Sequence, residues 1–349
     1  MEKTEVLVVG GGPGGLACAT RLAGQGMRVV LVERKVRFGD KVCAGGITMN
    51  GLLRSIPSNL IERRFSKQFV VSPRQQMELS TPHPTVATVN RERLAAWMRE
   101  QAEAAGVIVL IGTRVVALEP GRATLETDSG RRRLAFTRLV GADGANSRVR
   151  RFFGVPVSAR GLGVQGMYPM EHPRMEWHLD ANRFGVGYAW VFPHGTECSI
   201  GAYTISHSGS GRRLKEALLR WAGDRGWRLD PERLRAGLIN FDYRGFRFPG
   251  GWLVGEAAGL VSGLTGEGIF PAMVSGQAVA DEILGKGAAE QRLQGLLRRQ
   301  KCHHRLTDLA DRSRWLCGTL MESTLLLLRL RLLDFRKLEM TAPGFFCDA

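Results

Sequence analysis

The N-terminal residues follow a hydrophobic pattern that predicts a strand, a tight turn, a helix and a second strand. Residues 5–9 contain the apolar run Val-Leu-Val-Val, typical of a strand buried on both faces of a parallel sheet. Residues 10–15 are mostly glycine, residues 16–23 are typical of a helix lined with small side chains, and residues 28–32 form a second apolar run. We therefore expect a βαβ unit at the start of the chain.

A different pattern begins at about residue 160, where polar and apolar residues alternate. The segment 174–180 shows the alternation of a half-buried strand. Further elements are expected in this order: a turn at 180–182, a strand at 184–192, a turn at 193–195 and a strand at 198–204. These elements predict an antiparallel meander, and from about residue 286 the pattern becomes helical.

The glycine-rich turn satisfies the spacing G-x-G-x-x-G at Gly10, Gly12 and Gly15. The first glycine permits the tight turn, the second lets the backbone approach a pyrophosphate, and the third allows close packing of helix on strand. Glu33 closes the second strand, about twenty residues further on, and can accept hydrogen bonds from a ribose diol. Strand, helix, strand and acid in this order predict a dinucleotide site that prefers FAD or NAD to NADP.

A second match to the same spacing, at Gly161, Gly163 and Gly166, is followed by Met167-Tyr168-Pro169, which cannot open a helix. We therefore expect no dinucleotide site at this second match.

The formal net charge of +16 bears on binding partners and not on the fold. The arginines are spread along the chain and no zinc-finger or RNA-binding signature accompanies them, so we expect no nucleic-acid partner. The alternatives are phosphorylated ligands, an anionic membrane, or a basic surface with no partner. Cys302-His303-His304 lacks a second ligand pair at zinc spacing, so we expect surface or helix residues there and no metal site.

The six cysteines show no regular framework and the N-terminus carries no signal peptide, so we expect reduced thiols and a cytoplasmic protein.

Leu325–Leu333 is too short and too charged to span a bilayer. The basic C-terminal segment is either an interfacial helix on an anionic membrane or a cover of the core with extended arginines.

Two later segments look like further parts of the same cofactor site. Residues 139–148 and 251–259 each contain a strand end followed by an acid, Asp143 and Glu256. Together with the N-terminal motif they resemble the flavoprotein superfamily that includes para-hydroxybenzoate hydroxylase. The resemblance implies that the first motif binds the ADP half of FAD, that Glu256 (usually Asp in the superfamily) binds the ribityl chain, that Asp143 lies near the pyrophosphate, and that Arg91 reaches the phosphates.

The segment 265–269, Thr-Gly-Glu-Gly-Ile, opens a helix after the Glu256 strand. A glycine-rich helix start presents free N–H groups and a positive dipole end, which stabilise the negative charge of a reduced flavin.

Two motifs narrow the resemblance to the geranylgeranyl reductase family. These are Lys41-Val42-Cys43-Ala44-Gly45-Gly46-Ile47, similar to the family's Lys-x-Cys-x-Gly, and Tyr188-Ala189-Trp190-Val191-Phe192-Pro193, similar to its Tyr-x-Trp-x-Phe-Pro. Members reduce carbon–carbon double bonds in isoprenoid chains, and the resemblance places Cys43 near the reactive face of the flavin. A free cysteine is also commonly a small buried hydrophobe, and Cys18 on the first helix is expected to be one.

We therefore expect a mixed α/β protein with three parts: a discontinuous Rossmann-type FAD-binding domain (1–65, 85–160 and 250–285), an inserted antiparallel-sheet substrate domain (66–84 and 161–249) and a helical C-terminal segment (286–349). The expected cofactor-binding residues are Gly10, Gly12, Pro13, Gly14, Gly15, Glu33, Arg34, Lys41, Ala44, Gly45, Arg91, Val115, Asp143, Gly144, Gly255, Glu256, Thr265, Gly266, Gly268 and Ile269.

Tyr188, Trp190 and Phe192 alternate along one strand, so their side chains share a face and, with Pro193, form an apolar wall. The wall is either plain core or a pocket for a long hydrocarbon. The expected catalytic residues are Cys43, Tyr188, Trp190 and His178, with Cys43, Tyr188 and His178 as candidates for the proton donor.

The expected reaction transfers hydride from NAD(P)H, bound transiently, through FAD to an alkene carbon. Two alternatives stay open. One is an aromatic monooxygenase on the same scaffold, and the other is a non-catalytic, flavin-bearing electron-transfer protein.

Overall fold

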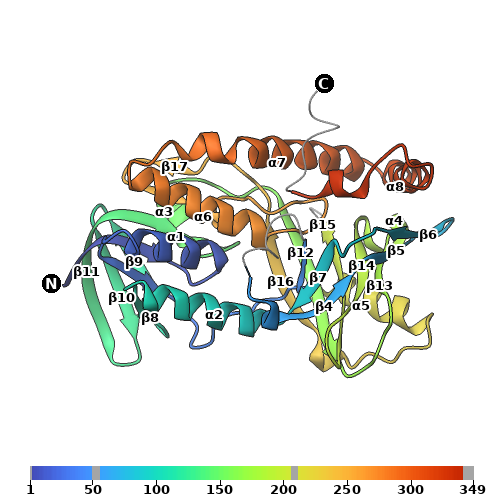
Figure 1. The fold of residues 1–349 in the computed structure, drawn as a ribbon, viewed down its shortest axis with the longest axis horizontal. Helices are drawn as coiled ribbons and strands as arrows, with labels where there is room; N and C mark the ends of the chain where they lie inside the picture. The colour runs from blue at the N-terminus through green and yellow to red at the C-terminus, as the bar shows by residue number, and fades with distance from the viewer. Residues whose placement is uncertain (1, 49–55, 206–210, 341–349) are drawn as a thin grey trace.

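The computed structural model describes residues 2–48, 56–205 and 211–340. Figure 1 shows a parallel sheet with α1 (Pro13–Ala23) and α2 (Arg91–Ala104) in one half of the molecule and a largely antiparallel sheet in the other. Helix α7 (Ala289–Asp311) runs along both halves and leads into α8 (Arg314–Arg329). This is the mixed α/β architecture with a helical C-terminal segment that the sequence predicts.

The first sheet has eight strands and a parallel core in the order β18-β11-β1-β2-β8. The apolar run of β1 lies in its centre, between β2 and β11, and Val6–Val8 are fully buried. The strands are β1 (Glu2–Val9), β2 (Val29–Val32), β8 (Ile108–Leu110), β9 (Arg114–Glu119), β10 (Arg122–Thr127), β11 (Gly130–Gly141), β17 (Arg247–Phe248) and β18 (Gly251–Leu253).

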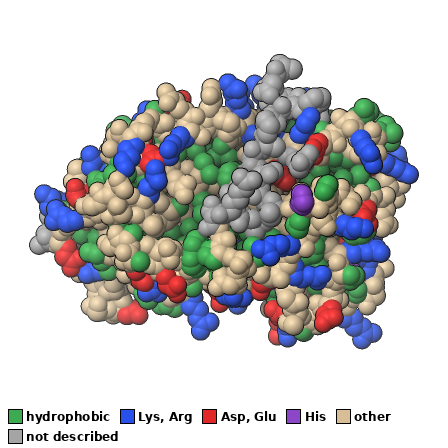
Figure 2. Space-filling view, viewed as in Figure 1, with side chains coloured by type: hydrophobic (Ala, Val, Ile, Leu, Met, Phe, Trp, Pro, Cys, Tyr) green, Lys and Arg blue, Asp and Glu red, His purple; other side chains and the backbone are tan. Residues whose placement is uncertain are grey.

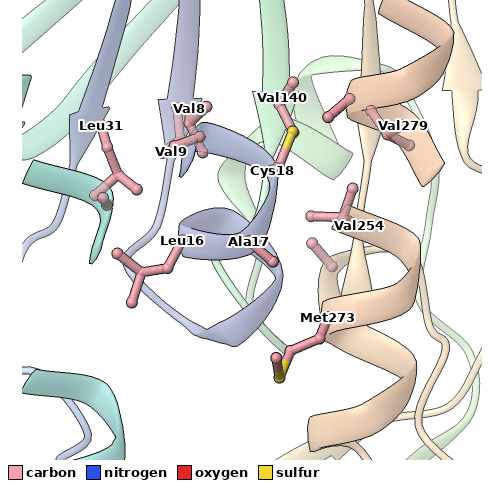
Figure 3. Close-up of a cluster of buried hydrophobic side chains, with 14 of the residues drawn as sticks. Val8, Val9, Leu16, Ala17, Cys18, Leu31, Val140, Val254, Met273 and Val279 are labelled. Atoms are coloured by element: carbon pink, nitrogen blue, oxygen red, sulfur yellow. The ribbon is translucent and has the colours of Figure 1, made fainter. Parts of the chain in front are cut away.

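Helix α1 packs closely on α6 (Ile269–Ile283) because small residues face each other. A Cβ on Gly276 would lie 2.2 Å from the Gly14 carbonyl oxygen. Cys18 is fully buried in this contact, and burial raises the pKa of its thiol to about 12, so it packs as a small hydrophobe, as predicted. Figure 3 shows Cys18 between the strands of the sheet and the α6 side chains Val279 and Met273.

The second sheet has seven strands in the order β16-β12-β15-β14-β13-β5-β6. Its two segments are distant in sequence and meet where β13 pairs with β5 in parallel. The strands are β5 (Lys67–Val71), β6 (Gln76–Ser80), β12 (Arg160–Tyr168), β13 (Met175–His178), β14 (Val186–Pro193), β15 (Cys198–Ile205) and β16 (Arg235–Asn240), and helix α5 (Gly211–Gly223) packs on β12 and β15. Apart from Arg160 at the start of β12, these strands lie within the segments 66–84 and 161–249 expected for the inserted sheet, and the domain bounds themselves stay a prediction.

A third, small sheet joins β3 (Gly46–Thr48), β7 (Val86–Val89) and β4 (Ile61–Phe65). The remaining elements are the short helices α3 (Arg148–Phe152) and α4 (Ala181–Phe184) and the 3₁₀ turns η1 (Ser58–Leu60), η2 (Pro231–Arg233), η3 (Gly255–Ala257) and η4 (Phe335–Leu338). Within the described residues, none of the helices combines the length and apolarity needed to cross a bilayer.

The structure bears on several local expectations. The second G-x-G-x-x-G match lies inside strand β12 and opens no helix, and two of its glycines make room for tyrosine rings: a Cβ on Gly161 would lie 2.4 Å from Tyr203 and one on Gly166 2.7 Å from Tyr168. The strand expected from Phe184 begins only at Val186, because Asp180 caps the short helix α4 through the N–H groups of Asn182 and Arg183. The turn expected at 180–182 is therefore the start of this helix.

Two further expectations concern the cysteines and the segment 302–304. Residues 302–304 lie on helix α7, which agrees with the helix alternative of the prediction, and His303 is buried there with 3% of its area exposed. Cys18, Cys43, Cys198 and Cys317 are free thiols, whereas Cys302 forms a disulfide bond, which the absence of a regular cysteine framework did not indicate.

Candidate active site

One cavity of about 1940 Å³ runs from the glycine turn after β1 to the antiparallel sheet and α8. Every expected cofactor-binding residue except Gly15 lines it. Three of the expected substrate-side residues, Tyr188, Trp190 and Phe192, line the same cavity, whereas Pro193 does not. The expected cofactor and substrate regions therefore share one cavity.

The glycine turn leaves open space at one position only. Gly10 has a positive φ of 108°, and a Cβ there would lie 2.4 Å from the Ala142 carbonyl oxygen. A Cβ on Gly15 would lie 2.0 Å from the Gly10 carbonyl oxygen, so Gly15 serves the packing of helix on strand. A Cβ on Gly12 would meet nothing closer than 3.9 Å and would project into the cavity. This is the space that a pyrophosphate needs.

Glu33 is fixed beside the turn by two backbone donors. The N–H of Gly11 donates to one carboxylate oxygen at 2.7 Å and that of Lys35 to the other at 2.9 Å. Glu33 also lines the cavity, so its remaining acceptor capacity faces the expected ribose.

Arg91 supplies an independent indication of an anionic ligand. It is the first residue of α2, capped by Asn90, and it lines the cavity. Its Nε and one terminal nitrogen are buried and find no hydrogen-bond partner within the described part of the chain. Buried guanidinium donors without acceptors are costly, so this arrangement fits a bound phosphate. The open space at Gly12 and the unpaired Arg91 donors together fit the pyrophosphate of a dinucleotide such as FAD.

Asp143 and Glu256, the acids of the two later segments, make different contacts. The Asp143 carboxylate accepts from the N–H of Arg148 at 2.6 Å and from the Ser147 hydroxyl, and so fixes the start of α3. Burial raises the pKa of Asp143. The Glu256 carboxylate forms an ion pair with Lys41 and lies next to Gly144, where a Cβ would come within 3.3 Å of it. Lys41 of the Lys-x-Cys-x-Gly motif therefore contacts the acid expected at the ribityl chain.

The segment 262–268 before α6, which we call the flavin loop, is held from two sides. Ser262 accepts from the N–H of Thr265 at 2.9 Å and contacts His303 of α7 at 2.8 Å. On the other side, the Tyr188 hydroxyl donates to the Thr265 carbonyl oxygen at 2.6 Å, and the Tyr203 hydroxyl to that of Gly263 at 3.0 Å. Sequence reasoning missed Ser262, His303 and Tyr203, because no spacing in the chain reveals these pairings.

The predicted aromatic wall on β14 is present and is wider than predicted. The ring centroids of Tyr188 and Trp190 lie 6.0 Å apart, and those of Trp190 and Phe192 lie 6.3 Å apart. Trp177 of β13 adds a fourth ring, 4.7 Å from Phe192 and 5.2 Å from Tyr188. The alternation in the segment 174–180 indicates a strand with two faces, and the pairing of β13 with β14 brings Trp177 opposite Trp190 on this one.

Cys43 is a free, half-buried thiol that lines the cavity. Its loop is held by His194, which follows directly on the Tyr-x-Trp-x-Phe-Pro motif and was not predicted as a site residue. One nitrogen of His194 contacts the Ala44 carbonyl oxygen at 3.0 Å and the other contacts Glu62 at 2.5 Å. His194 therefore connects the family's two motifs in space.

His178 does not reach the cavity. Its buried ring packs 4.9 Å from Trp221 of α5, and its nitrogens contact Glu176 at 2.9 Å and Arg225 at 3.0 Å. Burial lowers the pKa of His178. Adjacent strand residues point to opposite faces, so Trp177 takes the cavity face and His178 the other. The expectation that His178 donates a proton in the site is corrected accordingly.

Helix α8 closes the far side of the cavity with mostly apolar side chains. These include Cys317, Leu320, Met321, Leu325 and Leu328. The C-terminal segment is therefore part of the cavity wall, a role that its sequence pattern did not indicate.

These features define the chain as a flavoprotein: a family model described as "FAD binding domain" matches residues 3–182, which confirms the predicted cofactor. Proteins of similar sequence identify the family within the flavoproteins. The chain is 30% identical to the chloroplastic geranylgeranyl diphosphate reductase of rice (Oryza sativa), over 84% of this chain and 69% of the rice protein. It is 31% identical to the geranylgeranyl diphosphate reductase of Rhodobacter capsulatus, over 81% of this chain and 75% of that protein. The chain belongs to the geranylgeranyl reductase family of FAD-dependent oxidoreductases.

Solved structures agree on the fold. A geranylgeranyl bacteriochlorophyll reductase-like protein of Thermoplasma acidophilum matches with a TM-score of 0.76 and 22% identity, over 89% of this chain and 90% of that one. PqsL of Pseudomonas aeruginosa, described as a probable FAD-dependent monooxygenase, matches with a TM-score of 0.67 and 20% identity, over 92% of this chain and 100% of that one. The match of this chain spans 69%, 66% and 66% of three plant relatives, or about two thirds of their length.

Proposed function

We propose that this protein reduces carbon–carbon double bonds in an isoprenoid chain, with FAD as its resident cofactor and NAD(P)H as the electron donor. The observation that carries the proposal is the single cavity in which the expected FAD residues continue into an apolar wall of aromatic rings and α8 leucines. Transfer of a hydrocarbon from water into such a space is favourable, by roughly 25 cal/mol per Å² of apolar surface removed from water.

The residues divide the work along the cavity. Arg91 and the turn at Gly12 are placed for the phosphates, Glu33 for the ribose, and Glu256 with Lys41 for the ribityl chain. The flavin loop presents the backbone N–H groups that begin α6, which favour negative charge on the ligand. FAD, when bound, supplies the hydride chemistry. The four rings orient the alkene and exclude water.

An anaerobic turnover experiment tests this function. Purified protein is incubated with NADPH and geranylgeranyl diphosphate or geranylgeraniol without oxygen, and the molecular masses of the products are measured by mass spectrometry. We expect a gain of two hydrogens for each bond reduced. A protein that consumes NADPH only when oxygen is present would instead be a monooxygenase. Bound FAD without turnover of any isoprenoid would favour an electron-transfer protein.

We further propose that α8 rests on an anionic membrane surface. The side of α8 away from the cavity exposes Trp315 (78%) and Leu326 (48%), and Leu330 and Leu332 directly after it are exposed by 57% and 64%. The surrounding exposed cations are Arg312, Arg314, Arg329 and Arg331. Figure 2 shows hydrophobic and basic side chains together at the upper right, where Figure 1 places α8. Anionic lipid complements this mixture, since each cation near such a surface contributes about 1 kcal/mol.

Vesicle flotation tests the membrane proposal. We expect the wild type to float with phosphatidylglycerol vesicles more than with phosphatidylcholine vesicles, and Trp315→Glu with Leu330→Glu to abolish flotation. Val36→Glu, at an apolar position that is 69% exposed and far from α8 in sequence, is the matched control and should float normally. Equal flotation of all three proteins, or none of the wild type, would contradict a membrane role of α8.

A further inference from the structure

Glu267 is an acid in the cavity to which the sequence assigned no role. It lies between Gly266 and Gly268 in the flavin loop, where backbone N–H groups are expected to meet the flavin. One carboxylate oxygen accepts from the Thr48 hydroxyl at 3.3 Å and the other from the N–H of Met340 at 2.9 Å. A carboxylate offers about four acceptor positions, so these two contacts leave capacity for a proton or for a ligand.

The surroundings of Glu267 favour its neutral form. Burial raises the pKa of the Glu267 carboxyl, and the two opposing contributions come from the Met340 N–H and the Thr48 hydroxyl, not from a cation. Tyr188 is a titratable group near it, since the charge of Glu267 adds to the burial that raises the pKa of Tyr188, and Cys43 lies near the same tyrosine. Glu339 lines the same cavity beside Met340. A carboxylic acid kept protonated near neutral pH is able to donate a proton in catalysis.

The three donors suggested by the sequence are less suitable. The Tyr188 proton is engaged with the Thr265 carbonyl oxygen, and His178 lies behind the sheet. Cys43 does line the cavity, but a thiol S–H is a weaker hydrogen-bond donor than the O–H of a protonated carboxyl. Cys43 therefore fits a role in positioning the alkene better than a role as the acid.

We propose that Glu267 is the general acid of alkene reduction, which rests on the proposed function. One alkene carbon accepts the hydride that reduced FAD supplies, and the other accepts the proton from the Glu267 carboxyl. The π bond is replaced by two C–H bonds, FAD is left oxidised, and the Glu267 carboxylate regains its proton from water.

The experiment separates reduction of FAD from its reoxidation by the alkene. Holoprotein is reduced by NADPH without oxygen and then mixed rapidly with geranylgeranyl diphosphate or geranylgeraniol, and flavin absorbance is followed. We expect Glu267→Gln to keep FAD and its reduction by NADPH but to slow reoxidation by at least about 100-fold, the usual contribution of a general acid. Glu267→Asp should recover part of the rate. Glu197→Gln, at an exposed glutamate on the cavity rim, is the matched control and should behave as wild type.

A second readout does not depend on turnover. Infrared titration of the resting holoprotein should show a protonated carboxyl band at neutral pH that is lost in Glu267→Gln and kept in Glu197→Gln. Thr48→Val removes a hydrogen bond from Glu267 without removing the acid, so it should keep at least a tenth of the reoxidation rate. A structural role of Glu267 would instead make Thr48→Val as slow as Glu267→Gln.

The outcomes distinguish the two proposals. A wild-type protein whose reduced flavin no isoprenoid reoxidises would overturn the proposed function itself. An active wild type with an equally fast Glu267→Gln variant, or without the infrared band, would overturn the assignment of Glu267 alone.

Discussion

The Tyr188 hydroxyl donates a hydrogen bond of 2.6 Å to the carbonyl oxygen of Thr265. This contact joins β14 of the antiparallel sheet to the flavin loop, 77 residues further along the chain. A Cβ on Gly266 would lie only 3.0 Å from the same hydroxyl, so Tyr188 also packs directly on the loop. Tyr188 of the aromatic wall therefore helps to fix the position of the flavin loop.

Tyr188→Phe should weaken FAD binding as well as the fold. The substitution leaves the Thr265 carbonyl without its donor, which we expect to lower the free energy of unfolding by about 1–2 kcal/mol. Because the flavin loop loses a support, the dissociation constant of FAD, measured by fluorescence titration, should rise several-fold. Tyr168→Phe is the matched control, since the Tyr168 hydroxyl donates to the Asp230 carbonyl oxygen at 3.0 Å. It should lower stability similarly and leave FAD affinity unchanged; equal affinities in both variants would refute the role of Tyr188.

Gly12→Val should abolish FAD binding. The position is open to the cavity, so the valine side chain would fit the protein but would occupy the space of the pyrophosphate. We expect purified Gly12→Val to be colourless and to fail to bind FAD in a titration, with a thermal midpoint close to that of FAD-free wild type. Gly195→Val, where a Cβ meets nothing within 4 Å, is the control and should remain yellow. A yellow, FAD-loaded Gly12→Val protein would contradict the site.

Cys43→Ala should keep FAD and lose most turnover. The half-buried thiol lines the cavity, on a loop held by His194 through the Ala44 carbonyl oxygen. We expect turnover of an isoprenoid to fall at least about tenfold, which corresponds to about 1.4 kcal/mol on the barrier. Cys317→Ala changes a second free cysteine that lines the cavity, on α8, and should retain more activity. Equal turnover in Cys43→Ala and wild type would reduce Cys43 to packing.

The features that the sequence predicts best depend on neighbours along the chain. The turn from Gly10 to Gly15 and the strand that ends at Val32, directly before Glu33, belong to one βαβ unit, so their spacing along the chain is enough to predict a dinucleotide site there. The side chains of Tyr188, Trp190 and Phe192 share a face because β14 is a strand, which is equally local.

The features that the sequence did not predict depend on tertiary packing. Alternation along β13 gives two faces but does not say which one meets the cavity, so His178 was placed in the site and Trp177 was overlooked. Ser262 and His303 lie 41 residues apart, and Glu267 meets the Met340 N–H 73 residues away. Contacts of this kind leave no periodicity in the sequence, because they arise only once α7 and the C-terminal segment have packed on the flavin loop.

The burial of His303 predicts that stability falls in mild acid. Burial is the main cause that lowers the pKa of His303 to about 4, with the nearby Arg299 adding to it. An unfolded histidine titrates near 6.5, so between about pH 6.5 and pH 4 the unfolded chain binds a proton that the folded protein does not. This contribution to stability is complete above pH 6.5 and is lost as the pH falls towards 4.

Urea unfolding at pH 7 and pH 5 measures this loss. From the two pKa values we expect His303 to account for about 2 kcal/mol of the fall in unfolding free energy between these pH values. His303→Gln should be less stable than wild type at pH 7 and should show a fall smaller by that amount. His83→Gln makes the same substitution at an exposed position and should keep the wild-type fall. Parallel pH dependence in wild type and His303→Gln would mean that burial does not keep His303 in its neutral form.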